Sequence, residues 1–151
     1  PTFPNAKYLI VRDELAAFEA KAAAGGQNRA IFDDSLQPVL DAGQVVLVEA
    51  DHEIDDAVRL VPSPGHTPAH ACVAVRSRGA QATISGDVLH HPLQRLHPGW
   101  NSRACDDPAL ARATRRRFLE SHSDRDVVVL ASHFDPCRVV ANGDAFEFVD
   151  A

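Results

Sequence analysis

Short apolar runs separated by turn residues fill most of the sequence after residue 44. Runs of this length, bounded by glycine, proline, aspartate or asparagine, are typical of β-strands. The turn Asn142-Gly143-Asp144 joins the last two runs and predicts a β-hairpin. We therefore expect strands at residues 45–48, 58–61, 71–75, 82–85, 127–131, 137–141 and 145–149, with an earlier one at 7–11.

Helical patterns lie before and between these strands. Asp13 is a suitable N-cap for the first helix, and Gly25-Gly26 is expected to end it. The sequence predicts helices at residues 13–24, 35–41 and 108–121. Together, the strands and helices indicate one mixed α/β domain that spans residues 1–151.

The third helix and the segment before it are the clearest of these predictions. Asp107 followed by Pro108 is a typical helix start, because the aspartate caps free N–H groups and proline suits the first helical position. The run Arg115-Arg116-Arg117 is expected on the solvated face of this helix. Residues 90–107 have little periodicity and predict a long loop, which in a compact domain is often functional.

Charge and composition exclude several classes of partner. The formal net charge is −6 and hydrophobic residues make up 45% of the chain, which is typical of a globular protein and argues against a nucleic-acid surface. No apolar run approaches the ~20 residues that span a bilayer, so no membrane partner is expected. Three widely spaced cysteines indicate no disulfide framework. The location stays open, with the cytoplasm favoured.

The stretch PSPGHTPAH, residues 62–70, contains two histidines four positions apart. On a helix this spacing would place both on one face as zinc ligands. Gly65 and Pro68 forbid a regular helix, however, and three prolines restrict the backbone. We therefore interpret the stretch as a rigid loop that presents His66, with His70 packed or hydrogen-bonded beneath it.

Three polar residues follow apolar strands directly or within a short loop: His66, Asp87 and His133. A single histidine at a strand end is more often a surface residue, and a single Gly-Asp is more often a turn. Sites gather where strand ends converge, however, and two imidazoles with one carboxylate suit zinc or a similar divalent ion. Taken together, the three predict a metal site.

The motifs around these residues resemble those of the metallo-β-lactamase fold superfamily of hydrolases. The similarity rests on PGHTPAH at residues 64–70, SGDVLHHP at 85–92 and ASHFDP at 131–136. The opening, PTFPNAKYLIVRDEL, is similar to a segment of the branch that holds N-acyl-homoserine lactonases and methyl parathion hydrolase. The resemblance implies the C-terminal half of an αββα sandwich, with a mixed, mostly antiparallel sheet and flanking helices.

The resemblance also implies a site. His66 would bind a first metal, Asp87 would bridge two metals, and His133 would bind the second. Zinc is the expected metal. Two ions would generate a bridging hydroxide that attacks an ester-like bond of a small molecule, namely a lactone, an aryl ester or a phosphotriester. Asp87 would then be catalytic by accepting a proton. The expected walls of the substrate pocket are His90, His91, Leu93, Leu96 and Trp100.

The family's other ligands lie in an HxHxDH motif, which this sequence does not contain. We therefore expect an incomplete hydrolase that binds metal weakly or partially and pairs with a missing N-terminal half or with a second copy. One alternative is an inactive module that associates through its exposed sheet. Another is a thioester hydrolase similar to glyoxalase II, or a β-lactamase, on the same fold.

Overall fold

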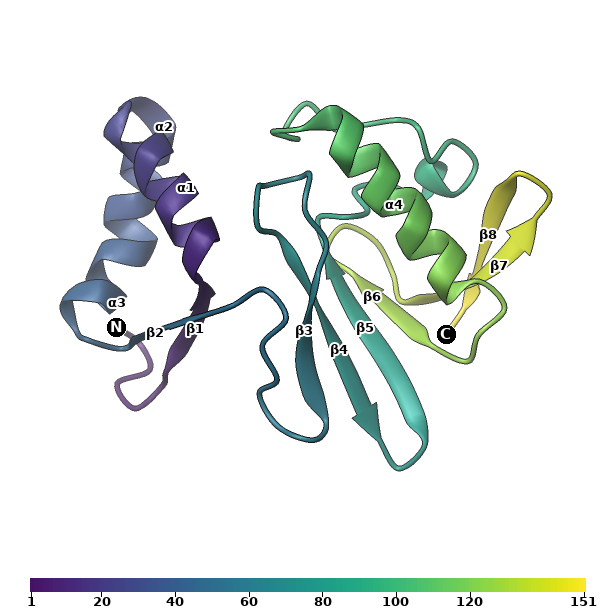
Figure 1. The fold of residues 1–151 in the computed structure, drawn as a ribbon, viewed down its shortest axis with the longest axis horizontal. Coiled ribbons are helices and arrows are strands. Elements are labelled where there is room, and N and C mark those ends of the chain that lie inside the picture. The colour runs from purple at the N-terminus through teal and green to yellow at the C-terminus, as the bar shows by residue number, and fades with distance from the viewer. The chain divides into compact units, whose positions relative to one another are not determined.

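A computed structural model describes residues 1–151, which divide into two compact units, Pro1–Ala50 and Asp51–Ala151. Figure 1 shows the elements of each unit. No helix in the chain is both long enough and apolar enough to cross a membrane. The motifs of the predicted metal site all lie in the second unit.

The first unit pairs two short parallel strands with a run of helical segments. Strand β1 (Tyr8–Val11) aligns with β2 (Val45–Val48), and Leu15, Ala22 and Phe32 are buried in its small core. Helical structure resumes earlier than the sequence predicted, because Gly25 adopts φ +85° and turns the chain after the first helix. The segments are α1 (Arg12–Ala23), α2 (Gly26–Ile31), the π-helical η1 (Phe32–Leu36) and α3 (Gln37–Asp41).

The second unit is built on a six-stranded sheet whose spatial order follows the chain from β3 to β8. Only β5 and β6 are parallel, and α4 forms the crossover between them. All other neighbours are antiparallel, so the prediction of a mixed, mostly antiparallel sheet is confirmed. The strands are β3 (Val58–Pro62), β4 (Ala71–Ser77), β5 (Ala80–Gly86), β6 (Val128–Ala131), β7 (Cys137–Asn142) and β8 (Ala145–Asp150).

Helix α4 (Pro108–His122) packs on one face of this sheet (Figure 1). Its start matches the sequence prediction: the Asp107 carboxylate accepts hydrogen bonds from the N–H groups of Ala109 and Leu110. Phe118 and Leu119 are buried in one core with sheet residues Cys72, Val129, Cys137, Val139 and Phe146. The helix thereby fixes the ends of the strands on which the candidate site is built.

The expectation that the run Arg115-Arg116-Arg117 of α4 faces solvent is wrong for Arg115, which is only 1% exposed. Its Nε donates to the Val88 carbonyl at 2.9 Å, and Nη1 donates to the carbonyls of Pro98 at 2.9 Å and Trp100 at 2.8 Å. Nη1 also donates to Asn101 Oδ1 at 3.1 Å. A guanidinium has several donors in one plane, so one side chain ties α4 to the loop that follows β5.

Candidate metal centre

Three strand-end loops bring His66, Asp87 and His133 together. His66 lies in the loop after β3, Asp87 follows β5 and His133 follows β6. His66 Nε2 lies 3.1 Å from Asp87 Oδ2, and His133 Nε2 donates to Asp87 Oδ1 at 2.9 Å. Each oxygen of one carboxylate therefore faces a different imidazole.

The loop at residues 62–70 is held rigidly against α4. Thr114 Oγ1 donates to the Pro64 carbonyl at 2.7 Å, and the N–H of Asp106 donates to the His66 carbonyl at 2.9 Å. Gly65 adopts φ +129°, and a Cβ there would lie 2.3 Å from the backbone nitrogen of Ala111. Glycine is required at this position, because both the backbone conformation and the close approach of α4 exclude a side chain.

His70 lies beneath the loop and supports Asp87. Its Nε2 accepts a hydrogen bond from the Asp87 N–H at 3.0 Å, so Nδ1 carries the proton and donates to Ser63 Oγ at 2.7 Å. A Cβ on Gly86 would lie 2.6 Å from His70 Nε2, so only glycine leaves room for this contact. His70 thus contacts the backbone of Asp87 from beneath the loop, and its support of a metal ligand stays a prediction.

His90 joins the group from the loop after Asp87. Its ring centroid lies 4.9 Å from that of His66 and 5.2 Å from that of His133, on which it stacks. Both of its ring nitrogens are buried and have no hydrogen-bond partner. Burial lowers the pKa of His90, and the charges of His66 and His133 act in the same direction, whereas Asp87 opposes it. A neutral imidazole with unpartnered nitrogens is the form that binds a metal.

These four residues, His66, Asp87, His90 and His133, are called the strand-end cluster below. Ligand atoms of His66, Asp87 and His90 lie within 4.8 Å of one another, which is close enough for a single ion. Buried polar atoms normally have partners, so the two nitrogens of His90 require an explanation. Imidazole nitrogens and a carboxylate oxygen suit zinc and other borderline divalent ions. The donor set therefore fits a divalent metal.

Comparison with known proteins identifies the family of this chain. Residues 4–133 match the family model described as the metallo-beta-lactamase superfamily. The chain belongs to the metallo-β-lactamase superfamily. No curated protein matches it.

Several solved structures share the fold of this chain at low sequence identity. The hydrolase AbOPH has a TM-score of 0.87 at 17% identity, and AidC, a dizinc quorum-quenching lactonase in complex with a product, has 0.81 at 20%. Each match covers 99% of this chain and 56% of the other. A probable metal-dependent hydrolase from Staphylococcus aureus has a TM-score of 0.71 at 18% identity, and the match covers 99% of this chain and 54% of the other. The chain thus spans little more than half the length of these proteins.

The residues predicted as pocket walls lie in different surroundings in this member of the superfamily. His90 is in the strand-end cluster. His91 is exposed and caps the 3₁₀-helix η2 (Pro92–Arg95), where its Nδ1 accepts from the Leu93 N–H at 3.1 Å. Exposed fractions are 44% for Leu93, 41% for Leu96 and 57% for Trp100. The structure does not bring these last four into one pocket with the cluster, so their role in binding substrate stays a prediction.

Sequence reasoning assigned His90 to a pocket wall and did not consider it as a ligand. Its position three residues after Asp87 could have indicated that role, because a tight turn of the chain can bring side chains three residues apart to the same side of the loop. Cys105 was also missed: its sulfur lies 4.0 Å from His66 Nδ1. Nothing in the local pattern around Cys105 predicts that contact. It depends on how the loop before α4 folds back onto the loop at residues 62–70.

Proposed function

We propose that this chain carries half of the centre of a metal-dependent hydrolase that cleaves an ester-like bond. The observation that supports this most strongly is the strand-end cluster, in which two buried ring nitrogens of His90 lack partners beside His66 and Asp87. Membership of the metallo-β-lactamase superfamily supports the same reaction class. Because the chain spans only about half of its structural relatives, activity is proposed for the whole protein.

In this proposal His66, Asp87, His90 and His133 hold the metal. A bound divalent ion lowers the pKa of water and polarises a carbonyl or phosphoryl oxygen. The contribution of this chain is to position the carboxylate: Asp87 contacts His66 and His133 through separate oxygens, while His70 holds its backbone. The Asp87 carboxylate is then placed to accept a proton as the scissile bond breaks.

For the substrate we propose a lactone, an aryl ester or a phosphotriester, with the lactone first. AidC is described as a quorum-quenching lactonase, and its structure holds the product N-hexanoyl-L-homoserine, which supports the lactone. The thioester and β-lactam alternatives share the same ligands and differ in the bond attacked. Zinc is the proposed metal because imidazole and carboxylate together suit it.

Metal binding by the 151-residue chain tests the proposal directly. Zn²⁺ titrated into the metal-free protein and followed by calorimetry is expected to bind saturably. Asp87→Ala and His90→Ala are each expected to weaken binding about tenfold or more, since each removes a ligand. Zinc-loaded protein is then assayed with N-hexanoyl-homoserine lactone, 4-nitrophenyl acetate and a phosphotriester to identify the bond class.

His91→Ala is the matched control, because this neighbouring histidine is exposed and lies outside the cluster. It is expected to bind Zn²⁺ as the native chain does. Equal loss of affinity in His91→Ala, or no loss in Asp87→Ala, would contradict the proposed ligands. A chain that binds no metal and sediments as a dimer would favour the alternative of an inactive module that self-associates.

A further inference from the structure

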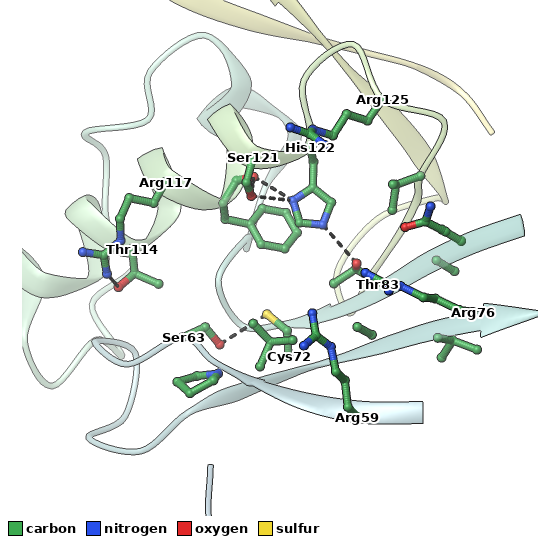
Figure 2. Close-up of a pocket in the computed structure, with 18 residues that line it drawn as sticks. Arg59, Ser63, Cys72, Arg76, Thr83, Thr114, Arg117, Ser121, His122 and Arg125 are labelled. Carbon is green, nitrogen blue, oxygen red and sulfur yellow. Dashed lines mark hydrogen bonds between the residues drawn. The ribbon is translucent and has the colours of Figure 1, made fainter. Parts of the chain in front are cut away.

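A second feature of the unit Asp51–Ala151 is a pocket of about 410 Å³ between α4 and strands β3 to β5. Its volume is within the range of small-molecule sites, roughly 300–1,000 Å³. Figure 2 shows that its side chains come from the sheet on one side and from α4 and the turn after it on the other. None of the strand-end cluster residues lines it.

Four arginines make this pocket strongly positive. Arg59, Arg76, Arg117 and Arg125 line it, and no aspartate or glutamate does. Arginine is always charged at physiological pH. The pocket therefore concentrates four positive charges on a chain whose formal net charge is −6.

None of these arginines is paired with a carboxylate. The arginines that do form ion pairs are Arg12, Arg29, Arg116 and Arg138. Arg117 instead donates to the Thr114 hydroxyl at 3.1 Å. Arg59 and Arg76 also border a smaller hollow of about 250 Å³ that contains three acidic residues, but no ion pair within 4.0 Å joins them to Glu53, Asp55 or Asp56.

Arg59 and Arg76 share the α4 side of the sheet. Arg59 lies opposite Ala74 in the register of β3 and β4, and Arg76 is two residues further along β4, so both point to the same face. Figure 2 shows both side chains directed into the pocket. Two like charges on diagonal positions repel each other. An anion between them would remove that repulsion and accept hydrogen bonds from both forks.

Part of the pocket lining is apolar. Val61, Ala74, Phe118 and Val127 line it beside the hydroxyl groups of Ser63 and Thr83. An inorganic ion alone would leave this apolar surface in water. An anion that carries a short apolar group would cover it and gain from its burial.

His122 adds a neutral polar group to the wall. Its Nδ1 donates to the Phe118 carbonyl at 2.8 Å, so Nε2 accepts from the Thr83 hydroxyl at 3.0 Å. Burial lowers the pKa of His122, and the charge of Arg125 acts in the same direction. The positive charge of the pocket therefore comes from its arginines alone.

From these contacts we propose that the pocket binds a small organic anion, a carboxylate or phosphate joined to a short apolar group. Arg59 and Arg76 bind the charged end and Phe118 and Val127 contact the apolar end. The pocket is separate from the strand-end cluster, so this binding requires neither a metal nor hydrolysis.

The test is a titration of the full 151-residue chain, made metal-free by passage over a chelating resin, followed by amide chemical shifts in NMR. Hexyl phosphate and hexanoate are the probes, and whichever binds more tightly identifies the charged group. The amides of Thr83 and Phe118 are expected to shift, and binding is expected to weaken as salt rises. The double variant Arg59→Gln/Arg76→Gln should lose about tenfold in affinity or more, since it removes charge-assisted hydrogen bonds.

The control is Arg103→Gln, which removes one exposed arginine outside the pocket and should leave binding unchanged. Arg59→Lys/Arg76→Lys keeps the charges without the planar fork and should bind with intermediate affinity. The proposal is overturned if neither probe binds, or if the glutamine double variant binds as tightly as the native chain. Equal binding of 1-hexanol or of inorganic phosphate would also overturn it, because either result removes one half of the proposed ligand.

Discussion

Two of the three loops that build the strand-end cluster are held in place in different ways. The loop at residues 62–70 carries His66 and is stiffened by its own prolines and by Gly65 against α4. The segment at 88–107 carries His90 and has little regular structure beyond η2. It is held by Arg115, which donates to four oxygens of this segment from the middle of α4.

The two loops therefore differ in what restricts their conformation: chiefly their own residues in the first, and hydrogen bonds from a distant residue in the second. Proline reduces the conformational freedom of the unfolded chain, so the first loop loses less entropy when it folds. The second loop is longer and carries only two prolines, Pro92 and Pro98, so hydrogen bonds from a distant residue must compensate for more of the cost of ordering it. His66 should therefore keep its position when Arg115 is replaced, whereas His90 should not.

Arg115→Met would separate the two loops most strongly. It leaves the carbonyls of Val88 and Pro98 without their donor, while the Trp100 carbonyl keeps its hydrogen bond from Gln94 Nε2. We expect the free energy of unfolding to fall by about 3–5 kcal/mol. Urea denaturation followed by circular dichroism measures this loss. In amide NMR spectra, residues 88–101 should become mobile while residues 62–70 remain ordered.

Arg116→Met is the matched control for that experiment. Arg116 is the next residue on α4, is exposed and pairs only with Glu120 at 2.9 Å, so its loss should change stability by less than about 0.5 kcal/mol. If the two variants were equally stable, the loop at 88–107 would be held by something other than Arg115.

Gly65→Ala is the corresponding change in the first loop, at residues 62–70. The new methyl group would meet the backbone of Ala111, and alanine would have to adopt a positive φ. Overpacking and backbone strain together should cost about 2–4 kcal/mol. Differential scanning calorimetry should show the lower melting temperature, and Zn²⁺ affinity should fall because His66 moves. Gly99→Ala is the control: its Cβ would meet nothing closer than 4.0 Å, and a result as severe as that of Gly65→Ala would contradict the steric argument.

The same contrast explains how much could be predicted from sequence. The strands, the Asp107 cap, the final hairpin and the meeting of His66, Asp87 and His133 all follow from local patterns, because strand ends and turn residues are visible in the chain itself. The burial of Arg115 could not be predicted, since a basic triplet on a helix usually faces solvent. The unpartnered nitrogens of His90 and the arginine pocket depend on tertiary packing in the same way.

Ser63→Ala is expected to have the smallest effect of the three variants, and it tests how far the first loop depends on hydrogen bonds. Ser63 Oγ accepts hydrogen bonds from His70 Nδ1 at 2.7 Å and from the Cys72 thiol at 3.2 Å. Burial raises the pKa of Cys72 to about 11, so the thiol stays protonated and remains a donor. Loss of this oxygen should cost about 1 kcal/mol.

Urea denaturation measures that cost, and nitrogen-15 NMR of the His70 ring reports its tautomer. We expect the proton to remain on Nδ1, because the Asp87 N–H still donates to Nε2. Ser77→Ala, at an exposed strand end, should be neutral. A mixture of His70 tautomers in Ser63→Ala would mean that this hydrogen bond, rather than proline and glycine, fixes the first loop, and the two loops would then differ only in where their donors lie.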